Sequence, residues 1–482
     1  MGTVHKVIKN TGVTLLGNLI FRLASLIVVI YLAQYLGVED FGKYNFVFAY
    51  LTFFGIITDL GLGDISVREM SRDDNNIPKI IGNVYIIKLI LSIFSILLLI
   101  FVTLVMEYPV DTTMYIYAAS ATLLFQSYSD IYRSLFQATL RMEFEVLAKL
   151  IAKLISIFLI LYIMFIHGTL FQIILILTLS ELIRALISYS FSRSIKRASF
   201  DIDSSLWMHL FKESLPIALS GLFLIIYHRI DVVMLSMMLS EGNLAVGLYS
   251  AAYKLSETLG VIPYAITASL FPVMSNSFKN SEDVLIKSYE FGYKFIILIM
   301  LPITVGTTLI SDKIILLIYD NSYLGSITAL QILVWATFLA SVNYLMVVLS
   351  ISINKQRLNT LLMGFCVIAN IAMNYLLIPQ YSYNGASIAT VATELFLFVL
   401  MFYLVSKNLK PIPIHKISIK IGIANLIMGI PVYYLNNFTT LNLFLIISFA
   451  IIVYIVALFA LKVFSYEEKK VIKGFLKVTA ND

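Results

Sequence analysis

Residues 80–106 read IIGNVYIIKLILSIFSILLLIFVTLVM, and Lys88 is the one charged side chain in this run. A helix needs about 20 consecutive apolar residues to cross the hydrocarbon core of a bilayer. Comparable apolar runs follow one another from the start of the chain to its end. The pattern predicts an all-α polytopic membrane protein.

The composition agrees with this prediction. Of the 482 residues, 60% are hydrophobic and 13% are charged, whereas an ordinary soluble domain carries about 25% charged residues. No stretch is left for a sizeable water-soluble domain. The single cysteine, Cys366, lies in an apolar run, which excludes a disulfide framework and a cysteine metal cluster. The first apolar stretch, 11–36, is too long for a cleavable signal peptide.

Turn signals between the apolar runs divide them into about 14 predicted transmembrane helices. Examples of these signals are Glu107-Tyr-Pro109 and Tyr383-Asn-Gly385. The predicted helices are 11–36, 41–63, 80–106, 112–138, 146–166, 169–191, 214–240, 246–274, 289–310, 326–350, 360–379, 385–406, 417–436 and 441–464.

The distribution of lysine and arginine predicts the orientation. The connections on the side of the N-terminus hold 21 of the 34 basic residues, and those on the opposite side hold Lys43 and Lys313. Positive charge accumulates in cytoplasmic loops. Both termini are therefore expected in the cytoplasm, and the net charge of +6 reflects topology rather than nucleic-acid binding.

A weak internal repeat predicts the domain organisation. Arg22 precedes Phe41-Gly-Lys-Tyr44 by about the distance that separates Arg229 from Val246-Gly-Leu-Tyr249. We expect two six-helix lobes around a central cavity plus two C-terminal helices, a plan of parallel repeats that transporters use. The expected parts are an N-terminal lobe at 1–191, a cytoplasmic linker at 192–213, a C-terminal lobe at 214–406, two further helices within 407–464 and a cytoplasmic tail at 465–482.

Several charges inside or at the ends of the predicted helices have an opposite charge three or four residues away on the same helix face. We interpret these as neutralised or as reaching the membrane interface. The pairs are Asp130–Arg133, Glu181–Arg184, Lys254–Glu257, Glu145–Lys149 and Glu290–Lys294.

Arg22, Lys88 and Arg229 have no acid three or four residues away. A charge at bilayer depth costs about 2.5–3.5 kcal/mol and needs a partner, a water-filled cavity or a function. Cations at this depth suit an anionic substrate, and arginine offers a fork of donors that matches phosphate oxygens. We therefore predict that these three bind a diphosphate or sugar headgroup. The alternative is pairing with acids on other helices, such as Asp231 or Glu394.

Four further residues are candidates for supporting roles. Asp231 and Glu394 have no basic partner in their own helices, so they are candidates for charge balance or ion coupling. Gly260 and Pro263 lie inside the predicted helix 246–274 and are a candidate hinge, since proline removes a helical hydrogen bond.

Enzyme motifs are absent from the sequence. It has no Gly-x4-Gly-Lys-Ser/Thr loop, no His-Glu-x-x-His and no Gly-x-Ser-x-Gly. The longest outward connection, about 311–325, is too short for a catalytic domain. The sequence therefore predicts neither an enzyme nor a bound cofactor or metal.

Several clusters of residues, which together cover about 10–395, carry a resemblance to a known family. They are Asn18 to Gly37, Tyr35-Leu-Gly-Val-Glu-Asp-Phe-Gly42, Asp59-Leu-Gly-Leu62, Ser66-Val-Arg-Glu69, Asp231, Val246-Gly-Leu-Tyr-Ser-Ala-Ala-Tyr253, Leu270-Phe-Pro-Val-Met274, Asn370 and Asn374 with Leu377-Ile-Pro379, Asn384-Gly-Ala386 and Ala389-Thr390. These clusters resemble the polysaccharide-transport (O-antigen flippase-like) family of the multidrug/oligosaccharidyl-lipid/polysaccharide exporter superfamily.

The resemblance implies a cell-membrane transporter that flips a polyprenyl-diphosphate-linked oligosaccharide, a precursor for polysaccharide biosynthesis. It implies two lobes around a cavity whose cations hold the diphosphate. Membrane lipids and glycan-assembly membrane enzymes are the candidate partners besides the substrate. The alternatives are a cation-coupled drug or small-molecule antiporter, a lipid-linked peptidoglycan-precursor flippase, a membrane-embedded polymerase or ligase, and a structural membrane protein.

Overall fold

The structure is a computed structural model that describes residues 3–409, 414–439 and 441–464. Several side chains before residue 24, including that of Arg22, and those of Lys279 and residues 414–416 lie outside the described part. The described chain divides into two compact units, Met1–Gly247 and Leu248–Asp482. Within the described ranges every regular element is a helix.

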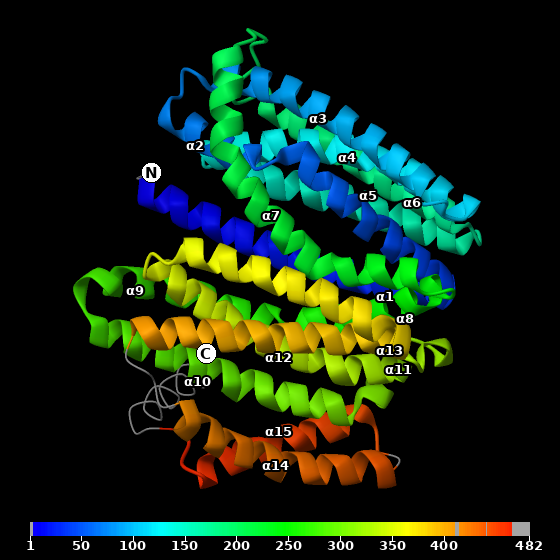
Figure 1. The fold of residues 1–482 in the computed structure, drawn as a ribbon, viewed down its shortest axis with the longest axis vertical. Coiled ribbons are helices and arrows are strands. Elements are labelled where there is room, and N and C mark those ends of the chain that lie inside the picture. The colour runs from blue at the N-terminus through cyan, green and yellow to red at the C-terminus, as the bar shows by residue number, and fades with distance from the viewer. Residues whose placement is uncertain (1–2, 410–413, 440, 465–482) are drawn as a thin grey trace, which may run out of the picture. The chain divides into compact units, whose positions relative to one another are not determined.

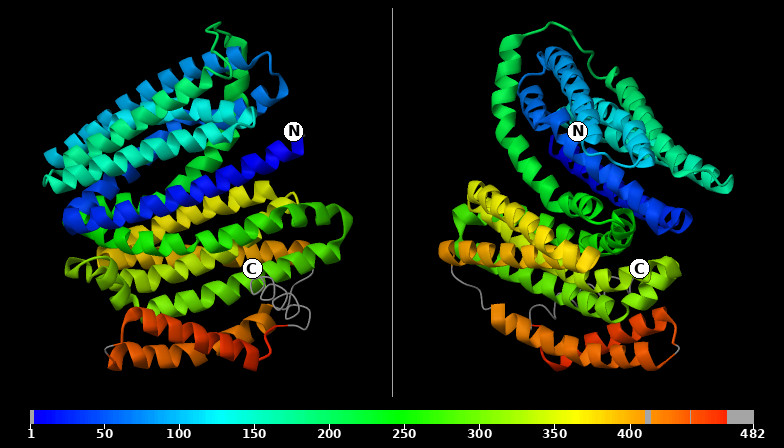
Figure 2. Two further views of the ribbon diagram at one scale, coloured as in Figure 1. Left: turned by 180° about the vertical axis from the view of Figure 1, so that it is seen from behind. Right: turned by 45° about the vertical axis from the view of Figure 1, so that its right-hand side comes forward.

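The first unit is built from long helices that lie alongside one another (Figure 1). Helix α7 follows a curved path in Figure 2 and contains Pro216, a residue type that bends helices. The helices are α1 (Thr3–Asp59), α2 (Leu62–Arg72), α3 (Ile77–Val105), α4 (Val110–Ala138), α5 (Met142–Phe165), α6 (Leu170–Ser192), α7 (Ser204–Met238) and the start of α8 (Gly242–Leu259).

The second unit contains the rest of α8 and the remaining helices. Helices α14 and α15 pack on α10, where the Tyr454 hydroxyl donates to the Leu298 carbonyl at 2.9 Å. The helices are α9 (Val261–Asn280), α10 (Glu282–Leu309), α11 (Ser311–Ile318), the 3-10 helix η1 (Asn321–Tyr323), α12 (Ser326–Ser352), α13 (Gln356–Asn408), α14 (Ile414–Phe438) and α15 (Leu443–Ala460).

Eleven segments of the described residues are long and apolar enough to span a membrane. Two of them, Ala24–Arg72 and Gln356–Asn408, are 49 and 53 residues long. Each contains a backbone break, at Gly37 (φ 69°) in α1 and at Ser382 (φ 53°) in α13. Because about 20 residues suffice for one crossing, each of these segments is long enough for two.

The two glycines of the weak repeat, Gly42 and Gly247, lie against neighbouring backbone. A Cβ atom on Gly42 would lie 1.8 Å from the Asn243 carbonyl oxygen, and one on Gly247 would lie 2.0 Å from the Val38 carbonyl oxygen. Small residues allow this approach between membrane helices. Glycine at these two positions therefore allows α1 to pack closely against the start of α8.

Helix α7 begins at Ser204, about ten residues before the apolar run predicted from 214. Asp203 caps it by accepting from the Ser205 and Leu206 N–H groups, and pairs with Lys79 of α3 at 2.7 Å. The Lys79 ion pair and the Ser205 hydrogen bond hold the pKa of Asp203 well below its usual range. Buried Asn83 accepts from the Asp203 N–H and from the Trp207 indole. These polar contacts outweigh the low hydrophobicity of 204–213 and extend the helix.

Candidate functional site

Three neighbouring cavities lie within the first unit, and all three include Gln126 of α4 in their lining. Their volumes are about 420, 450 and 210 Å³. The second and third also share Phe21, Lys149 and Arg184. We call these two the ion-rich cavity, and the first the acid-lined chamber.

Four cations and three carboxylates line the ion-rich cavity. They come from three adjacent helices: α4 supplies Asp130 and Arg133, α5 supplies Glu145, Lys149 and Lys153, and α6 supplies Glu181 and Arg184. The side chains on α5 follow one another at intervals of four residues, which places them on one helix face.

The two arginines of the ion-rich cavity are held by carboxylates. Arg184 lies 3.3 Å from Glu181 and 3.6 Å from Asp130, and Arg133 lies 3.5 Å from Asp130. The arginine Nε of Arg184 and the Oε2 of Glu145 are buried without a hydrogen-bond partner among the described residues. Unmatched buried polar atoms are costly, so this network is incomplete without a ligand or water.

The two lysines face an aromatic ring. The ammonium groups of Lys149 and Lys153 lie 4.3 and 5.5 Å from the centre of the Phe21 ring. Neither lysine takes part in an ion pair within the described part of the chain. A cation over an aromatic face contributes about 0.5–2 kcal/mol, so these amines can turn to an anion in the cavity at modest cost.

These cavity residues are not among the headgroup residues predicted from the sequence. Asp130–Arg133, Glu181–Arg184 and Glu145–Lys149 are interpreted there as neutralised or as reaching the interface, and two of these pairs do form. The spacing within each helix does not reveal that the three helices turn these faces toward one cavity. Lys153 has no acid three or four residues away, so the criterion that selected Arg22, Lys88 and Arg229 would have found it.

Two of the predicted headgroup residues lie on α1 and α7. Arg22 follows the cavity-lining residue Phe21 in α1, but its side chain is outside the described part. Arg229 is half-buried on α7 and interacts electrostatically with Tyr44, which lines the ion-rich cavity. Their binding of substrate stays a prediction.

Lys88 of α3 is fully buried, and its Nζ lies 2.5 Å from Oδ1 of Asp59 on α1. The Asp59 side chain also accepts from the Gly63 N–H at 3.2 Å. This geometry matches the alternative in which an acid on another helix balances the cation.

The two predicted supporting acids are buried. Asp231 of α7 is 4% exposed and accepts from the Val232 N–H. Glu394 of α13 is 6% exposed, and its Oε2 accepts from the Asn343 amide of α12 at 2.7 Å. Neighbouring Thr393 accepts from Asn370 at 3.2 Å, so amide and hydroxyl groups lie close to Glu394.

The candidate hinge coincides with a helix break. Helix α8 ends at Leu259 and α9 begins at Val261, with Gly260 between them. Pro263 lies in the first turn of α9, where a missing N–H costs little. The break lies at the predicted position, and its movement stays a prediction.

Comparison with known proteins gives a family match over more than half of the chain. A model of the family described as "Polysaccharide biosynthesis protein" matches residues 7–278. A probable low-salt glycan biosynthesis flippase of Haloferax volcanii is 24% identical over 200 residues, 41% of each chain. An uncharacterized membrane protein of Methanocaldococcus jannaschii is 24% identical over 226 residues, 45% of this chain and 44% of that one. The matches thus span less than half the length of these relatives.

Solved structures share the fold over most of the chain. The lipid II flippase MurJ in an inward closed conformation has a TM-score of 0.77 at 16% identity, covering 92% of this chain and 97% of that one. A multidrug resistance MATE family transporter in an inward-facing conformation has a TM-score of 0.68 at 14% identity, covering 83% and 95%. At such identities the likeness concerns the fold alone.

Proposed function

Because the chain belongs to the polysaccharide biosynthesis protein family, a family of multi-pass membrane transporters rather than enzymes, we propose that it flips a polyprenyl-diphosphate-linked oligosaccharide from the cytoplasmic to the outer leaflet. The proposed mechanism is alternating access, in which the protein opens to one side at a time. It needs no covalent chemistry. A protein is required because a charged headgroup cannot cross hydrocarbon unpaired.

One observation carries this proposal: the incomplete charge network of the ion-rich cavity. Its four cations exceed its three carboxylates. Lys149 and Lys153 lie one helical turn apart beside the Phe21 ring and next to Arg184, and neither forms an ion pair within 4 Å among the described residues. Charged donors form short, strong hydrogen bonds to phosphate oxygens. A diphosphate that bridged the two amines and Arg184 would supply the missing negative charge.

We place the other predicted cations around this core. Arg22 follows the cavity-lining Phe21, and Arg229 neighbours the cavity-lining Tyr44, so both are proposed to contact the headgroup at a different stage of the cycle. Lys88 is already paired with Asp59. We therefore assign Lys88 to charge balance instead of substrate contact.

The membrane arrangement completes the proposal. The two broken helices α1 and α13 each cross twice, and α4 crosses despite its lower hydropathy, which together with the remaining candidate spans gives fourteen crossings with both termini in the cytoplasm. The lobes are 1–191 and 214–406. Asp231 and Glu394 serve charge balance or ion coupling, and Gly260 with Pro263 serves as the hinge.

The test is reconstitution of the purified protein in liposomes with a fluorescent polyprenyl-diphosphate disaccharide, whose movement between leaflets is followed with a membrane-impermeant quencher. Wild type is compared with a Lys149→Gln, Lys153→Gln variant and with an Arg22→Ala, Arg229→Ala variant. Lys254→Gln is the matched control, because Lys254 is ion-paired within its own helix and lies outside the cavity.

We expect protein-dependent movement, at least about tenfold slower in both double variants and unchanged in the control. Absence of movement with folded protein under an imposed ion gradient would sink the flippase proposal and direct the work to drug efflux. Preference for a peptidoglycan precursor over other glycans would support the lipid-linked peptidoglycan alternative.

A further inference from the structure

The acid-lined chamber opens beside the ion-rich cavity. Its volume is about 420 Å³, within the range of small-molecule sites. It lies among α1, α2, α4 and α7, and shares Gln126 and Asp130 with the 450 Å³ part of the ion-rich cavity. A molecule whose charged end lay between the lysines could therefore extend past Gln126 into the chamber.

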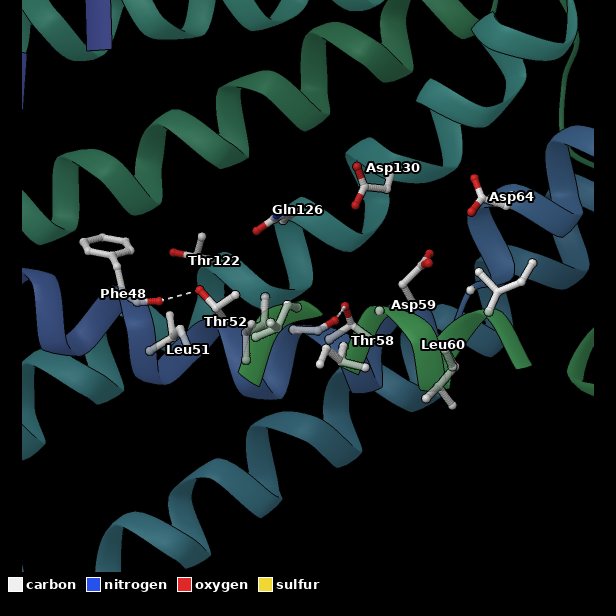
Figure 3. A pocket seen from close by; sticks show the side chains of 18 residues that line it. Phe48, Leu51, Thr52, Thr58, Asp59, Leu60, Asp64, Thr122, Gln126 and Asp130 are labelled. Carbon is white, nitrogen blue, oxygen red and sulfur yellow. Dashed lines mark hydrogen bonds between the residues drawn. The ribbon is translucent and has the colours of Figure 1, made fainter. Parts of the chain in front are cut away.

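The charge of the chamber is opposite to that of its neighbour. Asp59, Asp64 and Asp130 contribute carboxylates, and neither lysine nor arginine is among the residues that line it. Figure 3 shows the three carboxylates together on one side of the view, with Phe48 and Leu51 on the other.

The hydroxyls of the chamber also act as acceptors. Thr52 donates to the Phe48 carbonyl at 2.7 Å, and Thr58 donates to the Gly55 carbonyl at 2.8 Å. Their protons are therefore already used, and each presents lone pairs to the chamber. Among its lining side chains Gln126 alone offers N–H donors. The chamber fits a ligand that is rich in donors.

The three carboxylates differ in how far they are already neutralised. Asp59 is paired with Lys88 at 2.5 Å, and Asp130 lies 3.5 Å from Arg133 and 3.6 Å from Arg184. Asp64, in the first turn of α2, is exposed and has no ion pair within 4 Å among the described residues. The Asp64 carboxylate is therefore a negative charge in the chamber lining that no ion pair among the described residues offsets, and it acts on any ligand bound there.

We propose that the acid-lined chamber holds the sugars next to the diphosphate, and that it selects neutral or amino sugars over uronic acids. This inference rests on the flippase function proposed above. Sugar hydroxyls and ammonium groups donate to carboxylates. A uronate brings a carboxylate of its own, which has no cationic donor there and faces Asp64.

Selection against a wrong substrate by an unpaired or like charge is a common source of specificity. The two cavities therefore divide the headgroup between them: cations hold the diphosphate, and acceptors hold the glycan.

The experiment compares three polyprenyl-diphosphate disaccharides in the liposome assay, identical except that the second sugar is glucose, glucosamine with a free amine, or glucuronic acid. For wild type we expect glucose and glucosamine lipids to move at least about tenfold faster than the glucuronate lipid. Asp64→Asn should reduce this ratio severalfold, and Asp64→Lys should reverse it.

Asp74→Asn is the matched control, since Asp74 is a neighbouring exposed aspartate, paired with Lys196, that lies outside the chamber. It should keep the wild-type ratio. Equal movement of all three lipids by wild type, or an unchanged ratio in Asp64→Asn and Asp64→Lys, would overturn the selectivity while leaving the flippase function intact. Movement of none of them would instead overturn the flippase function.

Discussion

Two regions of the first unit contain lysines inside apolar helices, and the surroundings of these lysines differ in the two regions. On α3, Lys88 is fully buried and held at 2.5 Å by Asp59 of α1. On α5, Lys149 and Lys153 line a cavity and face the Phe21 ring. The comparison teaches that a cation is available to a ligand when the fold leaves space beside it. Missing sequence neighbours do not by themselves make it available.

The largest effect is expected from removing the acid that pairs with buried Lys88. Asp59→Asn leaves Lys88 buried without its partner, so the free energy of unfolding should fall by about 3–5 kcal/mol. Lys149→Met should lower it by less, about 0.5–2 kcal/mol, because it removes the contact of the ammonium with the Phe21 ring. Chemical unfolding in detergent measures both. Adding Lys88→Met to Asp59→Asn should restore much of the loss, and if it does not, the ion pair is not what stabilises α3.

The second prediction concerns ligand binding at Lys149 and Lys153 in the ion-rich cavity. A diphosphate disaccharide carried on a short prenyl chain, added at about 100 times its dissociation constant, should stabilise wild type by about 2.7 kcal/mol. The Lys149→Gln, Lys153→Gln variant should lose most of this gain, because the amines that would hold the phosphates are gone. Thermal unfolding with and without the ligand measures the difference, and an equal gain in the variant would show that the lysines do not bind it.

A third prediction concerns the close contact between the backbones of α1 and the start of α8 at Gly42, which involves no charged group. Gly42→Ala places a Cβ atom 1.8 Å from a backbone oxygen, so one helix must move, at a cost of about 1–3 kcal/mol. Gly221→Ala is the control, since a Cβ atom there meets nothing within 4 Å. If both variants unfold at the wild-type temperature, the approach of α1 to the start of α8 is looser than described.

The smallest effect concerns the partly exposed ion pair between Asp203, the N-cap of α7, and Lys79, which lies on the same helix as Lys88. The lowered pKa of Asp203 means that its stabilisation is present above the ordinary aspartate pKa of about 3.9 and is lost as pH falls below it. The difference in melting temperature between wild type and Asp203→Asn should be small at pH 7 and smaller still at pH 3. A difference that grows on acidification would contradict the role of the Lys79 pair.

Helix positions were largely predictable because hydrocarbon imposes a simple length rule on apolar runs. The predicted 80–106 and 326–350 correspond to α3 (Ile77–Val105) and α12 (Ser326–Ser352). The start of α7 was not predictable in this way. It depends on Asp203 as a cap and on Asn83 and Lys79, which are more than a hundred residues away in sequence.

The sequence by itself determined the class of the protein, its succession of apolar helices and the family clusters, since these follow from composition, period and local motifs. Tertiary structure alone decided which charges meet. Ion pairs between helices, such as Lys88–Asp59 and Arg184–Asp130, depend on how helices rotate and pack. That packing gathered Lys149, Lys153 and Arg184 around one cavity and placed Asp64 in the lining of another. The spacing of residues along a helix determines which side chains share a face. It does not determine which other helix or cavity that face contacts.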